Sequence, residues 1–379
     1  MRGSMQDMIV LRESEGGSFT RPLVAEILEL VRVEGIAGLM AMLSPFTMDR
    51  LCDELETALG YLLRGNRRRM ISVLLALLEE AGWCVREGSR WRFAPLDGDS
   101  QGSPDRSADR SAVSDPSTDD CQLRFFLECL KSVPAYLRGG TATFGFEGGS
   151  VDSWDRFLGS AELRCCRKLL FELMGVRNSR SFHLLDLCYG PGWGLAEAAS
   201  RYPSIRITAV DFTEVFAGTA RDRLRSIEEV SRTAGHTAAE VVWCAPGQWP
   251  GFGHPLPFRE ETFDAVFFSG GDPYIPRILR KYVYGDIACV LSPVGRLGIL
   301  TRGFPDPGRR FVPSPGMRMA SLVHDFAESV CEGWQGFAEP EETLRMFREL
   351  GYRGGGAIPG EMCSLESSLW VLRKGERSA

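Results

Sequence analysis

The sequence predicts an α/β protein in which a largely parallel sheet, with helices on both faces, follows a smaller and mostly helical domain. Two observations predict this fold. After residue 121, apolar strands alternate with amphipathic helices, which is typical of parallel βαβ units. Before residue 96, apolar residues recur instead at helical spacing, as in RPLVAEILELV and MISVLLALLEEAG.

A polar segment separates the two regions. Residues 96–120 (LDGDSQGSPDRSADRSAVSDPSTDD) carry almost no large apolar side chain and are rich in Ser, Asp, Gly and Pro. This composition is typical of a flexible linker. We therefore expect a disordered N-terminus over 1–19, a helical domain over 20–95, the linker over 96–120 and a sheet-containing domain over 121–379.

The second region contains regularly alternating elements. Apolar runs predict strands at 182–187, 206–211, 240–245, 263–270, 295–301 and 367–374. Amphipathic segments predict helices at 195–202, 213–231, 276–291 and 341–352. In a parallel sheet of this kind, the ligand binds beyond the carboxyl ends of the strands.

Composition excludes several classes of protein. A net charge of −6 argues against coating nucleic acid or an anionic membrane, and no apolar run reaches membrane-spanning length. The 11 cysteines include no C-x-x-C pair, so reduced and mostly buried thiols are expected, as in a cytoplasmic protein. No set of residues has the spacing of a metal site.

The first predicted strand runs into a glycine loop, LLDLCYGPGWG (184–194). Glycines at alternate positions let backbone N–H groups approach a ligand closely, where a Cβ would clash. Asp211 ends the second strand about 20 residues later, where a carboxylate can accept both hydroxyls of a ribose. Dehydrogenases and enzymes that use a methyl donor share this geometry, although the third glycine comes one residue too early for G-x-G-x-x-G.

Three motifs in order resemble class I S-adenosylmethionine-dependent methyltransferases. LLDLCYGPGWG resembles their first motif, and HPLPFREETFDAVFF (254–268) resembles their fourth-strand signature. LSPVGRLGIL (291–300) is similar to the entry into their fifth strand, and the resemblance covers 144–374. It implies a Rossmann-like methyltransferase sheet that binds S-adenosylmethionine or S-adenosylhomocysteine.

The resemblance also implies residues that would contact this cofactor. The methionine part would be surrounded by Asp186, Tyr189, Gly190 and Gly192. The ribose would bind Asp211, while Phe212, Cys244, Ala245 and Gln248 would lie at the adenine. Ser269 and Gly270 would approach the sulfonium. The family's usual acid after the third strand is replaced here by CAPGQW, and TFGFEGGSVDSW (143–154) resembles the aromatic segment that covers the cofactor.

Cys188 stands where the family usually has its first loop glycine. We interpret it as a small side chain that is tolerated because the backbone there needs no positive φ. A nucleophilic thiol beside a sulfonium is the alternative, but such a thiol would be alkylated by its own cofactor.

Residues 20–95 resemble the N-terminal winged-helix domain of small-molecule O-methyltransferases, in TMDRLCDELETALG, NRRRMISVLLALLEEAGW and CVREGSRWRFAP. In those relatives the domain forms the dimer and helps to close the substrate pocket, so a homodimer is expected. The same fold can bind DNA, and Arg67, Arg68 and Arg69 raise that possibility. The segment carries ten basic and ten acidic side chains, which favours a solvated surface and makes a nucleic-acid partner unlikely.

The candidate residues on the acceptor side are His324, Tyr274 and Asp272. His324 lies in the segment between the fifth strand and the last helix, whereas Asp272 and Tyr274 follow the fourth strand. A bulky apolar or aromatic acceptor is suggested by Phe304, Phe311, Met317, Met319, Trp334 and Phe337.

The expected function is methyl transfer to a small molecule, in secondary-metabolite (antibiotic) biosynthesis. One alternative keeps the fold but forms a cyclopropane, as a substrate carbon displaces S-adenosylhomocysteine from a sulfonium-linked substrate. Another is a winged-helix regulator with a metabolite-sensing domain.

Overall fold

The computed structural model describes residues 20–94, 121–146, 148–233, 238–301, 315–338, 340–358 and 367–375. The expected disordered N-terminus and the expected linker lie outside these residues. The chain divides into two compact units. One contains the described residues of Phe146–Val312 and Gln335–Ala379, and the other those of Gly17–Gly145 and Pro313–Trp334.

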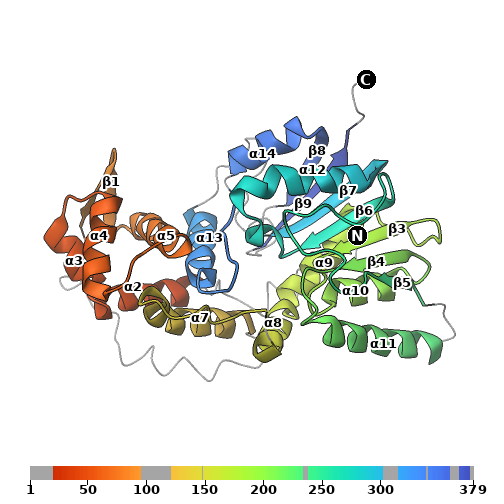
Figure 1. The fold of residues 1–379 in the computed structure, drawn as a ribbon, viewed down its shortest axis with the longest axis horizontal. Helices are drawn as coiled ribbons and strands as arrows, with labels where there is room; N and C mark the ends of the chain where they lie inside the picture. The colour runs from red at the N-terminus through yellow and green to blue at the C-terminus, as the bar shows by residue number, and fades with distance from the viewer. Residues whose placement is uncertain are drawn as a thin grey trace. The chain divides into compact units, whose positions relative to one another are not determined.

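The first unit is built on a seven-stranded sheet of order β5-β4-β3-β6-β7-β9-β8 (Figure 1). Strands β5, β4, β3, β6 and β7 are parallel, and β9 runs antiparallel between β7 and β8. Its strands are β3 (His183–Leu187), β4 (Arg206–Val210), β5 (Glu240–Trp243), β6 (Phe263–Ser269), β7 (Leu291–Thr301), β8 (Tyr352–Ile358) and β9 (Ser368–Lys374).

Helices cover both faces of this sheet. Figure 1 shows α9, α10 and α11 on one face and α12 and α14 on the other. The helical elements of the unit are η1 (Gly148–Ser150), α8 (Val151–Leu158), α9 (Ala161–Leu173), α10 (Trp193–Arg201), α11 (Ala217–Thr233), η2 (Asp272–Tyr274), η3 (Arg277–Leu279), α12 (Arg280–Val290) and α14 (Pro340–Glu349). The predicted α/β class and all six predicted strands are confirmed.

Four details differ from the predicted elements. Helix α11 begins at Ala217 instead of 213, and the helix predicted from 276 begins with the short turn η3 before α12. The last helix ends at Glu349, because Gly351 takes φ +80° and turns the chain into β8. Strand β8 was not predicted, since its YRGGGAI sequence lacks a strand pattern.

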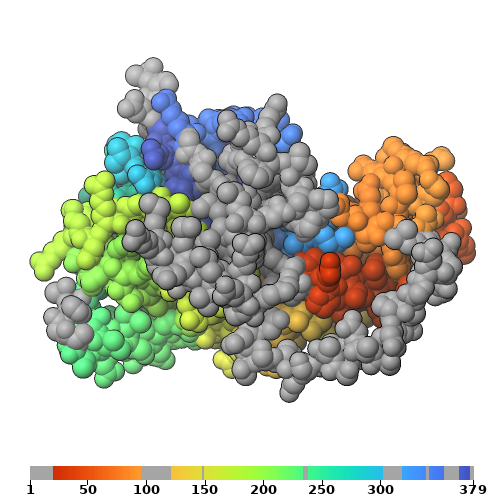
Figure 2. Space-filling view, turned by 180° about the vertical axis from the view of Figure 1, so that it is seen from behind, coloured from red at the N-terminus to blue at the C-terminus, as the bar shows by residue number. Residues whose placement is uncertain are grey.

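In its described residues, the second unit is helical with one β-hairpin. Its elements are α2 (Thr20–Val33), α3 (Ile36–Leu43), α4 (Met48–Leu59), α5 (Asn66–Glu80), β1 (Cys84–Glu87), β2 (Arg90–Phe93), α7 (Cys121–Leu137) and α13 (Pro315–Glu328). Helices α4 and α5 followed by the antiparallel hairpin match the predicted winged-helix-like order. Figure 2 shows the atoms of 20–94, coloured red to orange, packed closely together.

The division of the chain between the two units differs from the predicted domain boundary. The sequence predicts one continuous domain from residue 121, but α7 and α13 group with the N-terminal helices. The reason is their apolar faces. Phe126 of α7 and Phe326 of α13 are fully buried, and α13 packs against α5, α7 and α2.

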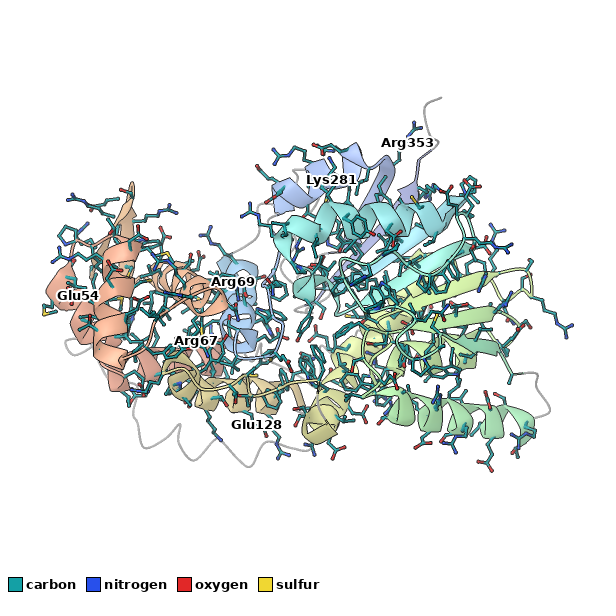
Figure 3. All side chains as sticks on the ribbon, viewed as in Figure 1. Glu54, Arg67, Arg69, Glu128, Lys281 and Arg353 are labelled. Atoms are coloured by element: carbon teal, nitrogen blue, oxygen red, sulfur yellow. The ribbon has the colours of Figure 1, made fainter. Side chains whose placement is uncertain are left out.

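The three consecutive arginines have separate roles in this unit. Arg67 donates to the carbonyls of Tyr136 (2.8 Å) and Gly140 (2.7 Å), and its guanidinium lies over the Tyr136 ring. Arg68 pairs with Asp49 at the surface (2.6 Å). Arg67 and Arg69, labelled in Figure 3, are therefore engaged inside the helical unit and do not form a basic surface patch.

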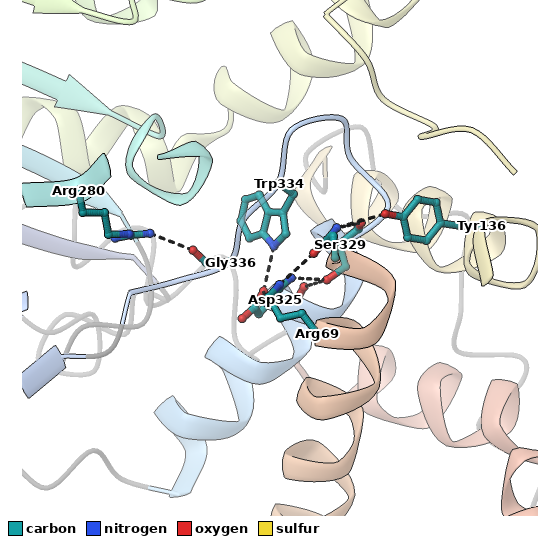
Figure 4. A network of polar contacts seen from close by, with 8 residues as sticks. Arg69, Tyr136, Arg280, Asp325, Ser329, Trp334 and Gly336 are labelled. Atoms are coloured by element: carbon teal, nitrogen blue, oxygen red, sulfur yellow. Dashed lines mark hydrogen bonds and ion pairs between the residues drawn. The ribbon is translucent and has the colours of Figure 1, made fainter. Parts of the chain in front are cut away.

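Arg69 is part of a polar network between α5 and α13 (Figure 4). It donates to Asp325 (2.7 Å) and to the Ser329 hydroxyl (2.7 Å). Asp325 also accepts from Trp334 Nε1 (2.9 Å), and Asn66 donates to the Ser329 carbonyl (2.6 Å). Within the described residues, no helix has both the length and the apolar character needed to cross a membrane.

Candidate functional site

The glycine loop joins β3 to α10 at the carboxyl end of the sheet. Gly190 and Gly192 have φ of +52° and +83°, which favours glycine at both positions. A Cβ on Gly192 would lie 2.8 Å from Ala220 Cα of α11, and a Cβ on Gly194 would lie 2.7 Å from Asp186 Oδ2. Backbone conformation and close packing therefore both require glycines in this loop.

Cys188 also has a positive φ, of +61°. The expectation that the backbone there needs no positive φ is wrong. The Cys188 N–H continues the hydrogen bonding of the sheet to the Val210 carbonyl (2.8 Å), and the chain then turns sharply into the loop. Burial raises the pKa of the thiol well above its usual range, as do Asp211 and Asp186. The side chain therefore stays a neutral thiol at neutral pH, which disfavours a nucleophilic role.

Asp211 connects the glycine loop to the end of β4. Its Oδ2 accepts from the Gly190 N–H (2.8 Å) and its Oδ1 from the Thr213 N–H (3.1 Å). Burial raises the pKa of Asp211 to about 6, although these backbone N–H groups lower it. The carboxylate can accept further hydrogen bonds, since an ionised carboxylate offers about four acceptor positions.

Asp186 and Arg167 are two buried ionisable side chains that influence each other electrostatically without forming an ion pair. Asp186 Oδ2 has no hydrogen-bond partner among the described residues, and neither do Nε and Nη2 of Arg167 on α9. Burial raises the pKa of Asp186 well above its usual range, with Asp211 acting in the same direction and Arg167 against it. Burial likewise lowers the pKa of Arg167 to about 10.

The residues expected at the adenine follow β4 and β5. The Phe212 ring lies 5.9 Å from that of Phe252, and Tyr189 contacts the ring of Trp243 edge-on at 5.2 Å. Gln248 is exposed, and its Oε1 accepts from the Ala245 N–H (3.1 Å). This hydrogen bond closes the turn after Cys244 and leaves the Gln248 oxygen one further acceptor position.

Ser269 and Gly270 end β6 beside an aromatic cluster. Gly270 takes φ +73°, and its N–H donates to the Leu300 carbonyl (3.0 Å). In what we call the aromatic cluster, Phe146 contacts the rings of Phe212 (5.0 Å) and Tyr274 (5.5 Å), and Trp154 contacts Tyr274 (6.4 Å). The segment expected to cover the cofactor thus lies against residues that follow β4 and β6.

Asp272 is held by contacts that stabilise the fold. It is fully buried, both of its oxygens accept from Arg280 Nη1 (3.1 Å), and Oδ1 also accepts from the Tyr284 hydroxyl. Arg280 further donates to the carbonyls of Asp272 (3.2 Å) and Gly336 (3.1 Å). A carboxylate held in this way is a poor general base, so the structure does not support the expected catalytic role.

His324 belongs to the helical unit, on α13, and not to the sheet-containing unit with Tyr274 and Asp272. Its side chain is 1% exposed, and its ring packs edge-on against Phe126 with centroids 4.2 Å apart. These are the surroundings of a core residue. Of the suggested acceptor-side apolar residues, Phe304, Phe311 and the Met317 side chain lie outside the described part, and Trp334 is buried against Asp325.

The structure also reveals residues that sequence reasoning missed. Asp155, Trp193 and Arg223 form a cluster behind the glycine loop, although Asp155 and Arg223 are 68 residues apart. The only signal in the sequence is the tryptophan inserted between two loop glycines. Among the described residues, no group of three His, Cys, Asp or Glu side chains could hold a metal ion.

Comparisons with known proteins agree with this geometry. No protein-family model matches the chain. Over 197 residues, which are 49% of this chain and 73% of the relative, it is 24% identical to demethylmenaquinone methyltransferase of Staphylococcus aureus.

Solved structures that resemble the chain over almost its full length include two methyltransferases. One is the CurJ carbon methyltransferase, with a TM-score of 0.64, 15% identity and coverage of 99% of this chain and 97% of that one. The other is the CMeT domain of the citrinin polyketide synthase, with a TM-score of 0.54, 12% identity and coverage of 99% and 98%. The chain thus has the fold of class I S-adenosylmethionine-dependent methyltransferases.

Proposed function

We propose that the protein transfers a methyl group from S-adenosylmethionine to a small organic molecule in secondary metabolism. One observation carries this proposal: the Gly190 N–H donates to the Asp211 carboxylate at 2.8 Å. The hydrogen bond connects the glycine loop to Asp211, the acid that we propose binds the ribose, beyond the carboxyl ends of β3 and β4. Ligands of open α/β sheets bind at this position.

The residues present fit the cofactor. Asp211 would accept the ribose hydroxyls, and the buried Asp186 carboxylate retains an oxygen that has no partner among the described residues. The narrow loop around Gly190 and Gly192 would admit the methionine part at a distance that a Cβ would prevent. When bound, the cofactor supplies an electrophilic methyl group on a sulfonium.

The aromatic cluster supports the acceptor side of the proposal. Aromatic faces attract cations, so Phe146, Tyr274 and Trp154 would favour a sulfonium and exclude water from it. Much of the catalysis of an in-line displacement is the positioning of the two reactants. We assign Tyr274 to the acceptor side, and we assign Asp272 to the support of the η2 turn that carries Tyr274.

The acceptor class is inferred from the named relatives. Their names specify demethylmenaquinone, a carbon methyltransferase and a polyketide synthase domain. These names favour a small organic acceptor with an apolar or aromatic body. The homodimer and the cytoplasmic location stay predictions, and light scattering of the purified protein tests the first.

The test is calorimetric titration of the full chain with S-adenosylmethionine and, separately, with S-adenosylhomocysteine. Wild type is compared with Asp211→Ala and with Asp222→Ala, a control whose side chain is 67% exposed on α11. We expect binding to wild type and to the control, and a loss of at least a hundredfold in Asp211→Ala. Strong preference for S-adenosylhomocysteine would favour the cyclopropane-forming alternative. No binding of either compound would overturn the proposal.

A further inference from the structure

The indole of Trp193 is held by an ion pair from two other helices. Trp193 Nε1 donates to the Asp155 carboxylate (2.8 Å) and to the Asp155 carbonyl (3.1 Å). Arg223 Nη2 donates to both oxygens of the same carboxylate, at 2.8 and 3.0 Å. The Arg223 guanidinium also lies 3.8 Å from the centroid of the Trp193 ring. We call these three residues the clamp.

The clamp reaches the glycine loop directly. Arg223 donates through Nη1 to the carbonyl of Pro191, which stands between two of the loop glycines. Trp193 is the first residue of α10, so the clamp fixes both the backbone of the loop and the helix that follows it. The two terminal nitrogens of Arg223 have different partners, because Nη2 binds the Asp155 carboxylate and Nη1 binds the loop carbonyl, so the guanidinium is fixed at two points.

Two glycines allow the clamp to close tightly. A Cβ on Gly159, at the end of α8, would lie 2.6 Å from Trp193 Cζ2. A Cβ on Gly192 would lie 2.8 Å from Ala220 of α11. The glycine loop is therefore packed between α8 and α11, the two helices that supply Asp155 and Arg223.

Helix α8 links the clamp to the aromatic cluster. Trp154, which precedes Asp155, contacts Tyr274 at 6.4 Å and lies 6.4 Å from the stacked ring of Phe146. A shift of α8 that broke the clamp would therefore also move one wall of the cluster. The ion pair is shielded from solvent, since the side chains of Arg223 and Asp155 are 16% and 27% exposed.

We propose that the Asp155–Trp193–Arg223 clamp is a positioning device that holds the glycine loop and the aromatic cluster in the arrangement that binds the cofactor. The two charges of the clamp neutralise each other, so its effect on the ligand is exerted through the loop backbone. Its effect on cofactor affinity rests on the proposed function, whereas its effect on the loop does not.

The clamp is tested by a double-mutant cycle on the full chain with Arg223→Gln, Asp155→Asn and the double variant. The matched control is the Arg225–Asp222 ion pair on α11, exposed by 73% and 67%, as Arg225→Gln and Asp222→Asn. Calorimetry with S-adenosylhomocysteine measures affinity per folded molecule. Each single clamp variant is expected to bind S-adenosylhomocysteine at least tenfold more weakly than wild type. The affinity of the double variant should lie within twofold of that of the single variant that binds more weakly. The control variants should stay within twofold of wild type.

Hydrogen exchange without ligand separates loop positioning from cofactor binding. Amides of 189–196 should exchange at least tenfold faster in Arg223→Gln than in wild type, with partial recovery in Arg223→Lys. If wild type binds no cofactor, the proposed function fails, and the exchange rates alone then test whether the clamp positions the loop. Unchanged exchange in folded Arg223→Gln, or unchanged affinity in both single variants, would overturn the clamp.

Discussion

Two polar clusters of the molecule differ in how completely their buried groups are paired. In the helical unit, the side chains of Arg69, Asp325, Ser329 and Trp334 each take part in a hydrogen bond within one network. At the carboxyl end of the sheet, Asp186 Oδ2 and two Arg167 nitrogens have no partner among the described residues.

This difference separates groups that stabilise the fold from groups arranged for a ligand. An unpaired buried polar atom costs free energy, and such atoms concentrate where function requires them. Cys188 adds backbone strain at the same end of the sheet, since its φ is +61°. Arg67 and Arg69 of the helical unit, by contrast, are held by internal partners, which disfavours a basic patch at the Arg67–Arg69 run that the regulatory, DNA-binding alternative would use.

The largest expected effect is on the paired network. Arg69→Ala leaves the Asp325 carboxylate without its cation, although the Trp334 hydrogen bond remains, and we expect a loss of about 2–4 kcal/mol in the free energy of unfolding. Arg68→Ala is the matched control, because its pair with Asp49 lies at the surface and should contribute less than about 1 kcal/mol. Thermal and denaturant unfolding measure both variants. Equal losses would show that the network does not stabilise the helical unit.

The next effect concerns two glycines at the second position of a helix, Gly194 of α10 and Gly218 of α11. A Cβ at Gly194 would lie 2.7 Å from both Asp186 Oδ2 and Phe267 Cε1, whereas nothing lies within 4 Å at Gly218. Gly194→Ala should therefore destabilise by about 1–3 kcal/mol through overpacking.

Gly218→Ala should be neutral or stabilising by up to about 1 kcal/mol, since alanine favours helix. Unfolding curves of the two variants decide this comparison. Equal changes in the free energy of unfolding would mean that the residues around Gly194 are packed less tightly than in the structure.

Much of the sheet and its ligand-binding edge could be predicted from sequence, because buried strands are apolar and the loop glycines have regular spacing. The rest depends on tertiary contacts. A buried Asp272 cannot be distinguished from an exposed loop acid by local sequence, since Arg280 and Tyr284 decide its environment. The pairing of Asp155 with Arg223, and the grouping of α13 with the N-terminal helices, likewise need the folded chain.

The third prediction uses the pKa of Asp211, which burial raises from 3.8 to about 6. Below pH 6 the unbound protein holds the proton, and the neutral carboxyl is a weaker acceptor for ribose hydroxyls. Affinity for S-adenosylhomocysteine should then fall by up to about tenfold per pH unit. Calorimetry between pH 8 and 5 measures this slope. A flat profile would contradict the role of an ionised Asp211.

The raised pKa of Asp211 also determines how the stability of the folded protein should change with pH. The folded state binds the Asp211 proton more tightly than the unfolded state, because the folded pKa is the higher one. Burying the charge therefore opposes folding above pH 6, and this cost is relieved as pH falls toward 4. The melting temperature of wild type minus that of Asp211→Asn should rise from pH 8 to pH 5. Asp222→Asn is the surface control, and a difference that falls instead would contradict the assigned sign.

The smallest effect isolates the backbone strain at Cys188. A non-glycine residue in the left-handed region costs about 1–2 kcal/mol, and glycine does not incur that cost. Cys188→Gly should therefore be more stable than Cys188→Ala by about 1 kcal/mol, since both variants lack the thiol and only alanine keeps the Cβ. Both should still bind S-adenosylhomocysteine, because the neutral thiol is not a nucleophile. If Cys188→Ala were the more stable of the two variants, the positive φ of Cys188 would not be a source of strain. The ligand-binding end of the sheet would then differ from the helical unit only in the buried polar atoms of Asp186 and Arg167 that have no partner among the described residues.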